Sequence, residues 1–427
     1  MLKRLYGKSA GAARMLNLVL LIAGYGFGQG SIFLAQTWLV AKGDLTTLAS
    51  FGTHFSFAML GILLVDAGGL VALARHASLA PEAESGRAGF EHTMWRKFWE
   101  VSVFRAFLAA MVIGGIAIAG IAGFMDDFSF HYALWAAPAF LIWSINAAGF
   151  LDGLKLSGIS GVSGSIAFIA SAVGLLLIGG SSASVAGTIL GVAFTAGYLL
   201  TVVVQFAALR VAGWPLRFER PGWAGIAASA RDGVALLGNT LPGQLNFRIQ
   251  LLISSTWLGM GPTALLVYVK QIIAAAAQLI GFIRRIEFPA LVQQLAGDVQ
   301  RPLAVVAKAQ RLGTLLALVM TAGIMVCGLV LTRIDHSASV DVGWYLALFS
   351  VTVATSAVLL GLGQGVAAMG RYNALFVCSS ISTAAGLLVG LALVQEAGLS
   401  GLFAGEIVAA ILGILLFASV LGKKTPK

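Results

Sequence analysis

Five charged side chains lie inside long apolar stretches of the sequence, where each could hold an ion, a proton or a charged group of a substrate. They are Asp66, Arg105, Arg248, Lys270 and Glu406. A charge near the centre of a membrane span costs about 2.5–3.5 kcal/mol on insertion scales, so it is expected to face a partner or a solvated cavity. These five residues are therefore the first candidates for functional chemistry.

Arg248 and Lys270 are cations on two consecutive apolar stretches. Measured along ideal helices from the turn between these stretches, they lie about 13 Å and about 10 Å below the same membrane surface. No acidic residue occurs between Gly233 and Arg285. We therefore predict a water-filled cavity that receives an anionic substrate group, with the amides Gln29 and Gln244 completing the substrate-binding set. The alternatives are that each cation extends to the headgroups or pairs with an acid from another span.

Asp66 and Arg105 have opposite charges and similar predicted depths, which favours an ion pair between the second and third spans. The same pair could instead open as a gate or carry a proton. Glu406 in the last span could carry a proton or pair with a cation of the C-terminal half. We therefore group Asp66, Arg105 and Glu406 as gating or ion-coupling candidates.

The elements that position these residues must lie in lipid. The chain has 427 residues, of which 59% are hydrophobic and only 10% are charged. Soluble domains carry about 25% charged residues, so a protein this apolar could not cover its own surface in water. The net charge of +10 is spread over short clusters between apolar stretches, which argues against nucleic-acid binding.

A membrane-spanning helix needs about 20 apolar residues, and the chain supplies about twelve such segments. The expected fold is therefore an all-α integral membrane protein. Three longer apolar stretches are divided at glycine-rich turns near 179–182, 259–262 and 370–373. The predicted spans occupy 16–41, 45–65, 106–125, 128–151, 156–209 (two spans), 233–283 (two spans), 312–332, 342–395 (two spans) and 397–421.

The distribution of Lys and Arg orients these spans. With a cytoplasmic N-terminus, most of the 27 basic residues, including Arg284 and Arg285, fall in cytoplasmic segments. The outside loops then hold only Lys42 and Arg333. This bias predicts that both termini are cytoplasmic and that the first span is retained.

The midpoint of the chain is a basic, aromatic segment with two prolines. We predict an N-terminal six-helix lobe over 1–212, a cytoplasmic linker over 213–223 and a C-terminal six-helix lobe over 224–427. Because each lobe has an even number of spans, the lobes are expected to be parallel repeats around a central cavity. A short sequence repeat supports this relation between the lobes. It consists of Thr37-Trp38-Leu39 at the end of the first span and Thr256-Trp257-Leu258 at the end of the seventh.

Other reactive residue types give no sign of catalysis. The five histidines, which include His54 and His131, lack metal-ligand spacing, and Cys327 and Cys378 lie singly in apolar stretches. Glycine-rich runs at 24–30 and 361–365 are interpreted as bending or close-packing segments rather than nucleotide loops. The aromatic and charged stretch 81–100 is interpreted as an interfacial anchor. We predict a protein that is not an enzyme and uses no cofactor or metal.

Four short motifs carry a family resemblance. They are Gly26-Phe27-Gly28-Gln29-Gly30, Asp66-Ala67-Gly68-Gly69-Leu70, Asn246-Phe247-Arg248 and Phe288-Pro289-Ala290-Leu291. With these motifs the chain resembles the polysaccharide transporter (Wzx-type flippase) branch of the multidrug/oligosaccharidyl-lipid/polysaccharide exporter superfamily. The resemblance implies a polyprenyl-diphosphate-linked oligosaccharide that is flipped to the periplasmic leaflet of a bacterial inner membrane. It also implies polysaccharide polymerase and chain-length machinery as partners.

Two other functions remain open at this stage. The first is a cation-coupled multidrug exporter of the same superfamily, with Asp66 or Glu406 as the proton site. Drug-exporting relatives often carry an acid in the first span, which this chain lacks. The second is a membrane scaffold or a polysaccharide polymerase, but a polymerase would need a large periplasmic loop and all predicted outside loops are short.

Overall fold

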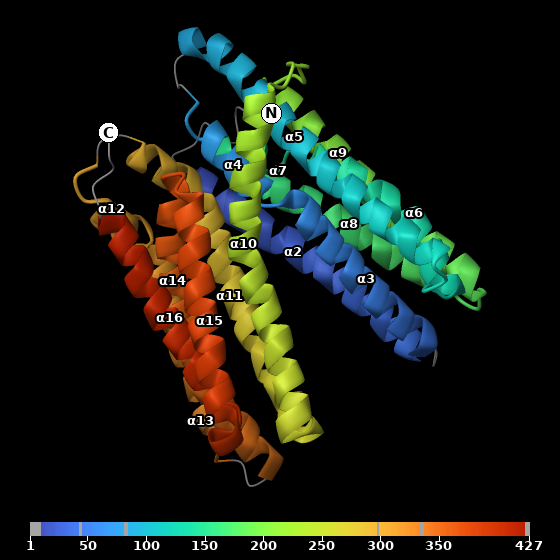
Figure 1. The fold of residues 1–427 in the computed structure, drawn as a ribbon, viewed down its shortest axis with the longest axis vertical. Helices are drawn as coiled ribbons and strands as arrows, with labels where there is room; N and C mark the ends of the chain where they lie inside the picture. The colour runs from blue at the N-terminus through green and yellow to red at the C-terminus, as the bar shows by residue number, and fades with distance from the viewer. Residues whose placement is uncertain (1–9, 42–44, 81–83, 297–298, 334–336, 423–427) are drawn as a thin grey trace. The chain divides into compact units, whose positions relative to one another are not determined.

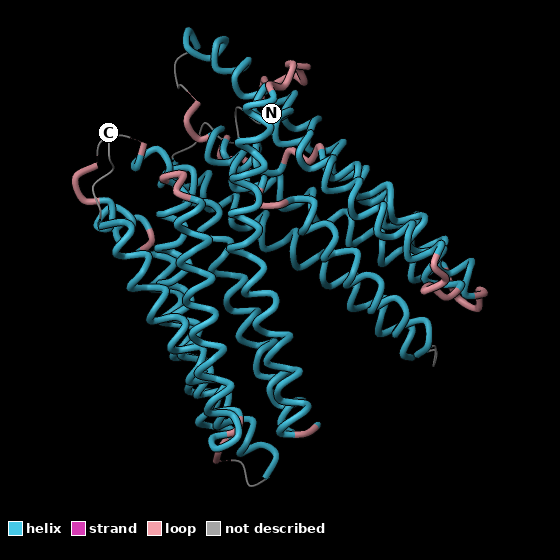
Figure 2. Tube along the Cα trace, viewed as in Figure 1, coloured by secondary structure: helices cyan, strands magenta, loops and turns pink. Residues whose placement is uncertain are grey.

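The computed structural model describes residues 10–41, 45–80, 84–296, 299–333 and 337–422. Over these residues the chain forms helices and connecting loops, with no strands (Figure 2). The helices gather into two compact units, Met1–Val234 and Ala235–Lys427. Each unit is described by itself.

The N-terminal unit contains six long helical elements (Figure 1). Helix α2 packs along α8, and α6 packs along α9. The second and fourth elements are both broken in two, as α3–α4 and α6–α7. The bounds are α2 (Ala10–Ala41), α3 (Leu45–Asp66), α4 (Gly69–Ala77), α5 (Glu84–Ile121), α6 (Asp127–Ser144), α7 (Ala148–Gly153), α8 (Ser157–Leu177), α9 (Ala183–Val211) and α10 (Trp223–Ile253), of which the first part belongs to this unit.

The C-terminal unit begins within α10 and contains the remaining helices. Here α15 packs along α16 and α13 along α14. A π-helical turn ends α10, and a short helix precedes α13. The bounds are η1 (Ser254–Leu258), α11 (Met260–Leu295), α12 (Pro302–Ala309), α13 (Arg311–Leu331), α14 (Ser337–Ala368), α15 (Tyr372–Ala397) and α16 (Leu399–Gly422).

Ten helices of the described chain are long and apolar enough to cross a membrane, or eleven when the bent pair α3–α4 counts as one span. The remaining predicted span is the seventh, which corresponds to α10. This helix has 31 residues, but polar side chains such as Asn239, Gln244 and Asn246 recur along it, and it is not among the helices apolar enough to be counted. The structure thus confirms the predicted all-α membrane fold, with the predicted glycine-rich turns between α8 and α9, at the start of α11, and between α14 and α15.

Two features of these spans were not predicted. From Glu84 onward the stretch 81–100 is continuous with the third span as the 38-residue helix α5, and its role as an interfacial anchor remains a prediction. The fourth span has the predicted extent, with one candidate span over Asp127–Gly153, but it contains a break, since α6 stops at Ser144 and α7 begins at Ala148. Mean hydropathy does not detect this break, because most residues on both sides of it are apolar and Asn146 is the single polar residue between the two pieces.

Glycine allows the close packing of α2 on α8. A methyl group on Gly24 would lie 3.0 Å from backbone atoms of Gly161 and Val162, whereas one on Gly26 would meet nothing within 4 Å. Membrane helices associate through small residues because these let two backbones approach. The run 24–30 therefore serves close packing within a continuous helix, which is one of the two interpretations made from the sequence.

The segment 213–223 is held on the N-terminal unit. Trp214 is buried, the Trp99 indole donates to the Arg217 carbonyl at 2.9 Å, and the Arg217 guanidinium pairs with Glu91 at 3.3 Å. The first turns of α10 continue these contacts, with the Lys97 ammonium donating to the Ser229 hydroxyl at 2.9 Å. The passage from one compact unit to the other therefore falls after Val234, inside α10.

Candidate functional site

The N-terminal unit contains two helix breaks joined by one arginine. Helix α3 stops at Asp66, and the chain then takes left-handed backbone angles at Ala67 (φ 41°) and Gly68 (φ 70°) before α4 begins. Helix α6 stops at Ser144. Each broken helix exposes backbone carbonyls with no partner in their own helix, and each C-terminus carries a partial negative charge.

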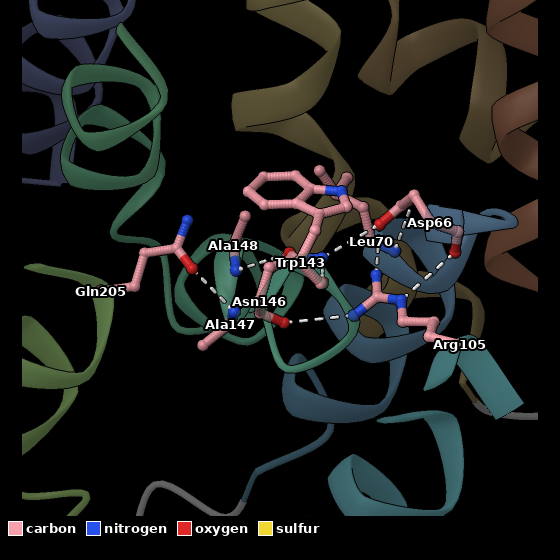
Figure 3. Close-up of polar contacts among 8 residues, drawn as sticks. All are labelled: Asp66, Leu70, Arg105, Trp143, Asn146, Ala147, Ala148 and Gln205. Carbon is pink, nitrogen blue, oxygen red and sulfur yellow. Dashed lines mark hydrogen bonds and ion pairs between the residues drawn. The ribbon is translucent and has the colours of Figure 1, made fainter. Parts of the chain in front are cut away.

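Arg105 of α5 caps both of these helix ends (Figure 3). Its side chain is 0% exposed. Its Nε donates to the Asp66 carbonyl at 3.2 Å, its Nη1 donates to the Asn146 carbonyl at 3.1 Å, and its Nη2 pairs with the Asp66 carboxylate. A guanidinium suits this position because its donors point in several fixed directions at once.

The helices that restart after each break receive acceptors in turn. The Asp66 carboxylate accepts from the Leu70 backbone N–H at 3.4 Å, near the start of α4. The Asn146 side-chain oxygen accepts from the N–H of Ala148 at 3.3 Å, and the Gln205 side chain of α9 accepts from the N–H of Ala147 at 2.8 Å. Oxygen acceptors at helix starts complement the positive end of the helix dipole. We call the group Asp66, Arg105, Asn146 and Gln205 the N-lobe clamp.

The N-lobe clamp depends on a close approach at Gly69. A methyl group there would lie 2.5 Å from the Arg105 guanidinium, so glycine leaves the space that the arginine occupies. The side chain of Asp66 stays 17% exposed, so solvent reaches the carboxylate but not the fully buried guanidinium. The predicted proximity of Asp66 and Arg105 is therefore present, and the structure adds that the pair closes two broken helices.

In the C-terminal unit, Lys270 of α11 pairs with Glu406 of α16. The two side chains are 16% and 12% exposed, and the ammonium lies 5.2 Å from the centre of the Phe349 ring of α14. The expectation that Lys270 is an uncompensated cation is therefore wrong. Its counter-ion lies 136 residues further along the chain, so the structure confirms the alternative in which Glu406 pairs with a cation of the C-terminal half.

Arg248 lies on an exposed face of α10. Gln244 lies one helical turn before it, so both side chains project from the same face, and both are exposed. Within the described residues, Arg248 makes no ion pair or hydrogen bond. Gln29 is half-buried on α2 in the other unit. The predicted binding role of these three residues remains a prediction.

Arg284 is a buried charge that the sequence interpretation missed. It was assigned to a cytoplasmic loop with Arg285, but it lies inside α11 with 1% of its surface exposed. It donates to the backbone carbonyl of Ala357. A methyl group on Gly361 would lie 3.0 Å from its Nη1, so the glycine run 361–365 provides the space. This glycine run in the tenth span is the sequence feature that could have indicated a bulky side chain packed against that helix.

The chemistry of these groups is electrostatic. No cluster of three or more potential metal-binding side chains occurs in the described parts of the chain. Each unit instead has a largely buried ion pair between two of its helices, and the second unit has an exposed cation, Arg248, without a partner among the described residues. Such an arrangement can hold a solute, exchange ions or fix helices.

Comparison with solved structures shows which known proteins share this fold. The outward-facing multidrug resistance MATE family transporter of the MOP superfamily superposes with a TM-score of 0.72 at 15% identity, covering 97% of each chain. A MATE structure in complex with MaD3S gives 0.74 at 16% identity, covering 96% of each. The eukaryotic MATE transporter AtDTX14 gives 0.68 at 15% identity, covering 96% of this chain and 94% of that one. The chain therefore has the fold of these transporters, two lobes of six helices.

Comparison at the level of sequence found no match. No protein-family model matches the chain, and no curated protein matches it. The predicted flippase branch of the superfamily consequently rests on the residues of this chain.

Proposed function

We propose that this protein is a multi-pass transporter of the bacterial inner membrane that works by alternating access. Its proposed substrate is a polyprenyl-diphosphate-linked oligosaccharide, moved from the cytoplasmic to the periplasmic leaflet. The transporter class is supported by the fold, which agrees with MATE transporters over almost the whole chain. A cavity between two helical lobes is the usual place for a substrate in such transporters.

The substrate class is inferred from which of the charged side chains within the spans have an ion-pair partner and which do not. The two acids named above as possible proton sites of a cationic-drug exporter, Asp66 and Glu406, are ion-paired with Arg105 and Lys270. Arg248, in contrast, is exposed and has no partner among the described residues. A free guanidinium matches a phosphate group, to which it can donate two parallel hydrogen bonds. The balance of unpaired charge therefore favours an anionic substrate.

The second candidate is a cation-coupled multidrug exporter. It is favoured by the multidrug resistance function named for the MATE structure with the same fold. In that case one of the two ion pairs would open, and the released carboxylate would bind a proton or a cationic drug. The two candidates thus differ in which charge is available to the substrate.

Depletion of the protein in its own cells separates the two candidates. The flippase proposal predicts that lipid-linked repeat units accumulate, as read by mass spectrometry, while surface polysaccharide disappears. Labelling of spheroplasts should then find these lipids on the inner leaflet. Unchanged lipids and polymer, together with increased sensitivity to cationic dyes, would replace this proposal with the exporter.

The proposed partners follow from the proposed substrate. A flipped repeat unit must be polymerised on the far side, so a polysaccharide polymerase and chain-length machinery are expected beside this protein. Copurification from membranes after mild cross-linking tests this expectation, with a strain lacking surface polysaccharide genes as the control.

A further inference from the structure

The end of the C-terminal unit where α13 begins contains a cavity that the proposed transport function does not use. The short helix α12 packs there against α13 and α14. The cavity has a volume of about 290 Å³ and is lined by these three helices and by the turn between α12 and α13. Pockets for small molecules begin at about this size, so the cavity fits a headgroup rather than a large solute.

Gln310, in the turn before α13, gives the cavity wall a polar group without a partner. It is 3% exposed, and its Nε2 donates to the Gln364 side chain of α14 at 3.0 Å. Its Oε1 has no hydrogen-bond partner among the described residues. Reversing both amides would leave an N–H unpaired instead of an oxygen. Because a buried polar group without a partner is costly, this arrangement indicates that a polar group of a ligand occupies the cavity.

A buried guanidinium lies directly behind the same wall. Gly361 lines the cavity, and a methyl group on Gly361 would lie 3.0 Å from Nη1 of Arg284. Nη2 of Arg284 donates to the Ala357 carbonyl, while its Nε and Nη1 have no hydrogen-bond partner within the described chain. No ion pair joins Arg284 to an acid in these residues. Its positive charge therefore acts across a wall of glycine backbone, in surroundings that screen it poorly.

The mouth of the cavity adds further positive charge. Arg311 lines the cavity and is exposed. Arg301 and Lys308 are exposed nearby on the chain, and no acidic residue occurs between Arg301 and Leu331. The start of α13 also places the positive end of its helix dipole here. The charge around the cavity thus complements an anion.

The cavity continues into an apolar face of α13. Leu315 lines the cavity and is 50% exposed. Val319 and Val326 lie on the same face of the helix further along and are exposed as well. Helix α13 is a candidate membrane span that buries little of its surface in the protein, so this face meets lipid. A ligand that matches both parts has an anionic head and an apolar chain.

We propose that this cavity binds the headgroup of an anionic phospholipid, with the phosphate at Arg311 and Gln310 and one acyl chain along Leu315 and Val319. Arg284 adds buried positive charge behind the wall. With the predicted orientation, the lipid belongs to the cytoplasmic leaflet. The bound lipid contacts α12, α13 and α14 together and so stabilises the C-terminal unit. This inference is independent of the transported substrate.

Native mass spectrometry of the full-length protein tests the charge of the site. Phosphatidylglycerol is the probe, and phosphatidylcholine with the same acyl chains and no net charge is the comparison. Phosphatidylglycerol should bind more tightly, and Arg311→Gln should weaken its binding about three- to tenfold. Lys308→Gln is the matched control, because it removes the same charge at an exposed position that does not line the cavity. It should change the binding less than about twofold.

A second variant tests the space rather than the charge. Val358→Trp places a large side chain at the cavity wall formed by α14, and it should reduce phosphatidylglycerol binding without any change in net charge. Thermal unfolding without added phospholipid shows whether each variant is folded. Added phosphatidylglycerol should raise the melting temperature of the wild type more than that of Arg311→Gln. Because Arg311 is exposed, its substitution gives a result that does not depend on how Val358→Trp folds.

Four outcomes would overturn the proposal. Equal losses in Arg311→Gln and Lys308→Gln would reduce the effect to general attraction by surface charge, and equal binding of the two phospholipids would remove the preference for an anion. Competition by glycerol phosphate, which has no acyl chains, would assign the cavity to a soluble phosphate. Displacement by a lower concentration of polyprenyl diphosphate would assign it to the proposed substrate. A protein that never flips a lipid-linked oligosaccharide contradicts the proposed function, while these binding results still decide the lipid site.

Discussion

At the scale of single residues, the three cations that the sequence places within spans fall into two kinds. Arg105 and Lys270 are neutralised by acids on other helices and hold those helices together. Arg248 is exposed and lacks a partner within the described chain. Sequence inspection found all of these residues, because a charge in an apolar span is conspicuous. It could not pair Lys270 with Glu406, because their contact depends on how α11 and α16 pack.

The N-lobe clamp predicts strong coupling between Arg105 and Asp66. Arg105→Ala should lower the unfolding free energy by about 3–5 kcal/mol, because it leaves a carboxylate without its buried partner. Adding Asp66→Ala should then cost little more. Thermal unfolding of the purified variants in detergent measures this, with the exposed Arg96→Ala of the same helix as the control, for which we expect less than about 1 kcal/mol. Strictly additive losses at 66 and 105 would contradict the clamp.

Arg248 and Lys270 should respond differently to the same substitution. Under the proposed function, Arg248→Ala should leave thermal unfolding unchanged and reduce flipping by about 10- to 150-fold, since one charge-assisted hydrogen bond contributes about 1.5–3 kcal/mol. Arg248→Lys should retain more activity than Arg248→Ala. Flipping of the lipid-linked probe in vesicles is the measurement, and full activity of Arg248→Ala would remove this residue from the substrate site.

Lys270→Ala should instead lower stability, because Glu406 would be left unpaired. The double variant Lys270→Ala with Glu406→Ala should recover part of this loss. The same thermal unfolding assay tests the prediction. If Lys270→Ala melts like the wild type but no longer transports, then Lys270 acts in transport and not in holding α11 to α16.

At the scale of elements, hydropathy predicted nearly every helix but missed the breaks. The stretch from 128 to 151 is predominantly apolar, yet α6 ends at Ser144 and α7 begins at Ala148. What allows this break is a set of distant partners, Arg105 and Gln205, which satisfy the freed backbone groups. Polar backbone exposed by such a break is tolerated in a membrane only when protein groups satisfy it. A one-dimensional pattern does not contain that information.

The packing of α2 on α8 predicts opposite outcomes for two neighbouring glycines. Gly24→Ala should destabilise the protein by about 1–3 kcal/mol, because the added methyl meets backbone that cannot move aside. Gly26→Ala meets open space and should be neutral, or stabilising by up to about 1 kcal/mol through helix propensity. Thermal unfolding of the two variants side by side checks this, and equal melting would mean that α2 does not approach α8 through Gly24.

At the scale of the whole molecule, the fold of two six-helix lobes is shared with MATE transporters, whereas the substrate is not readable from the fold. One architecture serves several functions, and the site must be argued from its own residues. The span count and the halving of the chain followed from apolar segment lengths. The substrate assignment, in contrast, depends on which charges remain unpaired, and this required the structure.

The predicted orientation of the whole chain is tested by cysteine labelling. In a background with Cys327 and Cys378 replaced by serine, Ser181→Cys in the loop between α8 and α9 should react with a membrane-impermeant maleimide in intact cells. Leu216→Cys, exposed on the linker, should react only after the membrane is permeabilised. The basic-residue bias gives this expectation, and the reverse pattern would place both termini outside.

The two ion pairs also differ in when they can form during synthesis. Asp66 and Arg105 are 39 residues apart, so α3 and α5 can leave the insertion machinery as a neutralised hairpin before the rest of the lobe exists. Lys270 must wait 136 residues for Glu406. Every nascent chain that has not yet released α16 therefore holds a lysine without its counter-ion in the bilayer. Insertion of α16 supplies the counter-ion of Lys270 and lowers the cost of holding this lysine within the bilayer. We expect a chain truncated before α16 to keep the lysine unpaired and to be degraded by quality-control proteases.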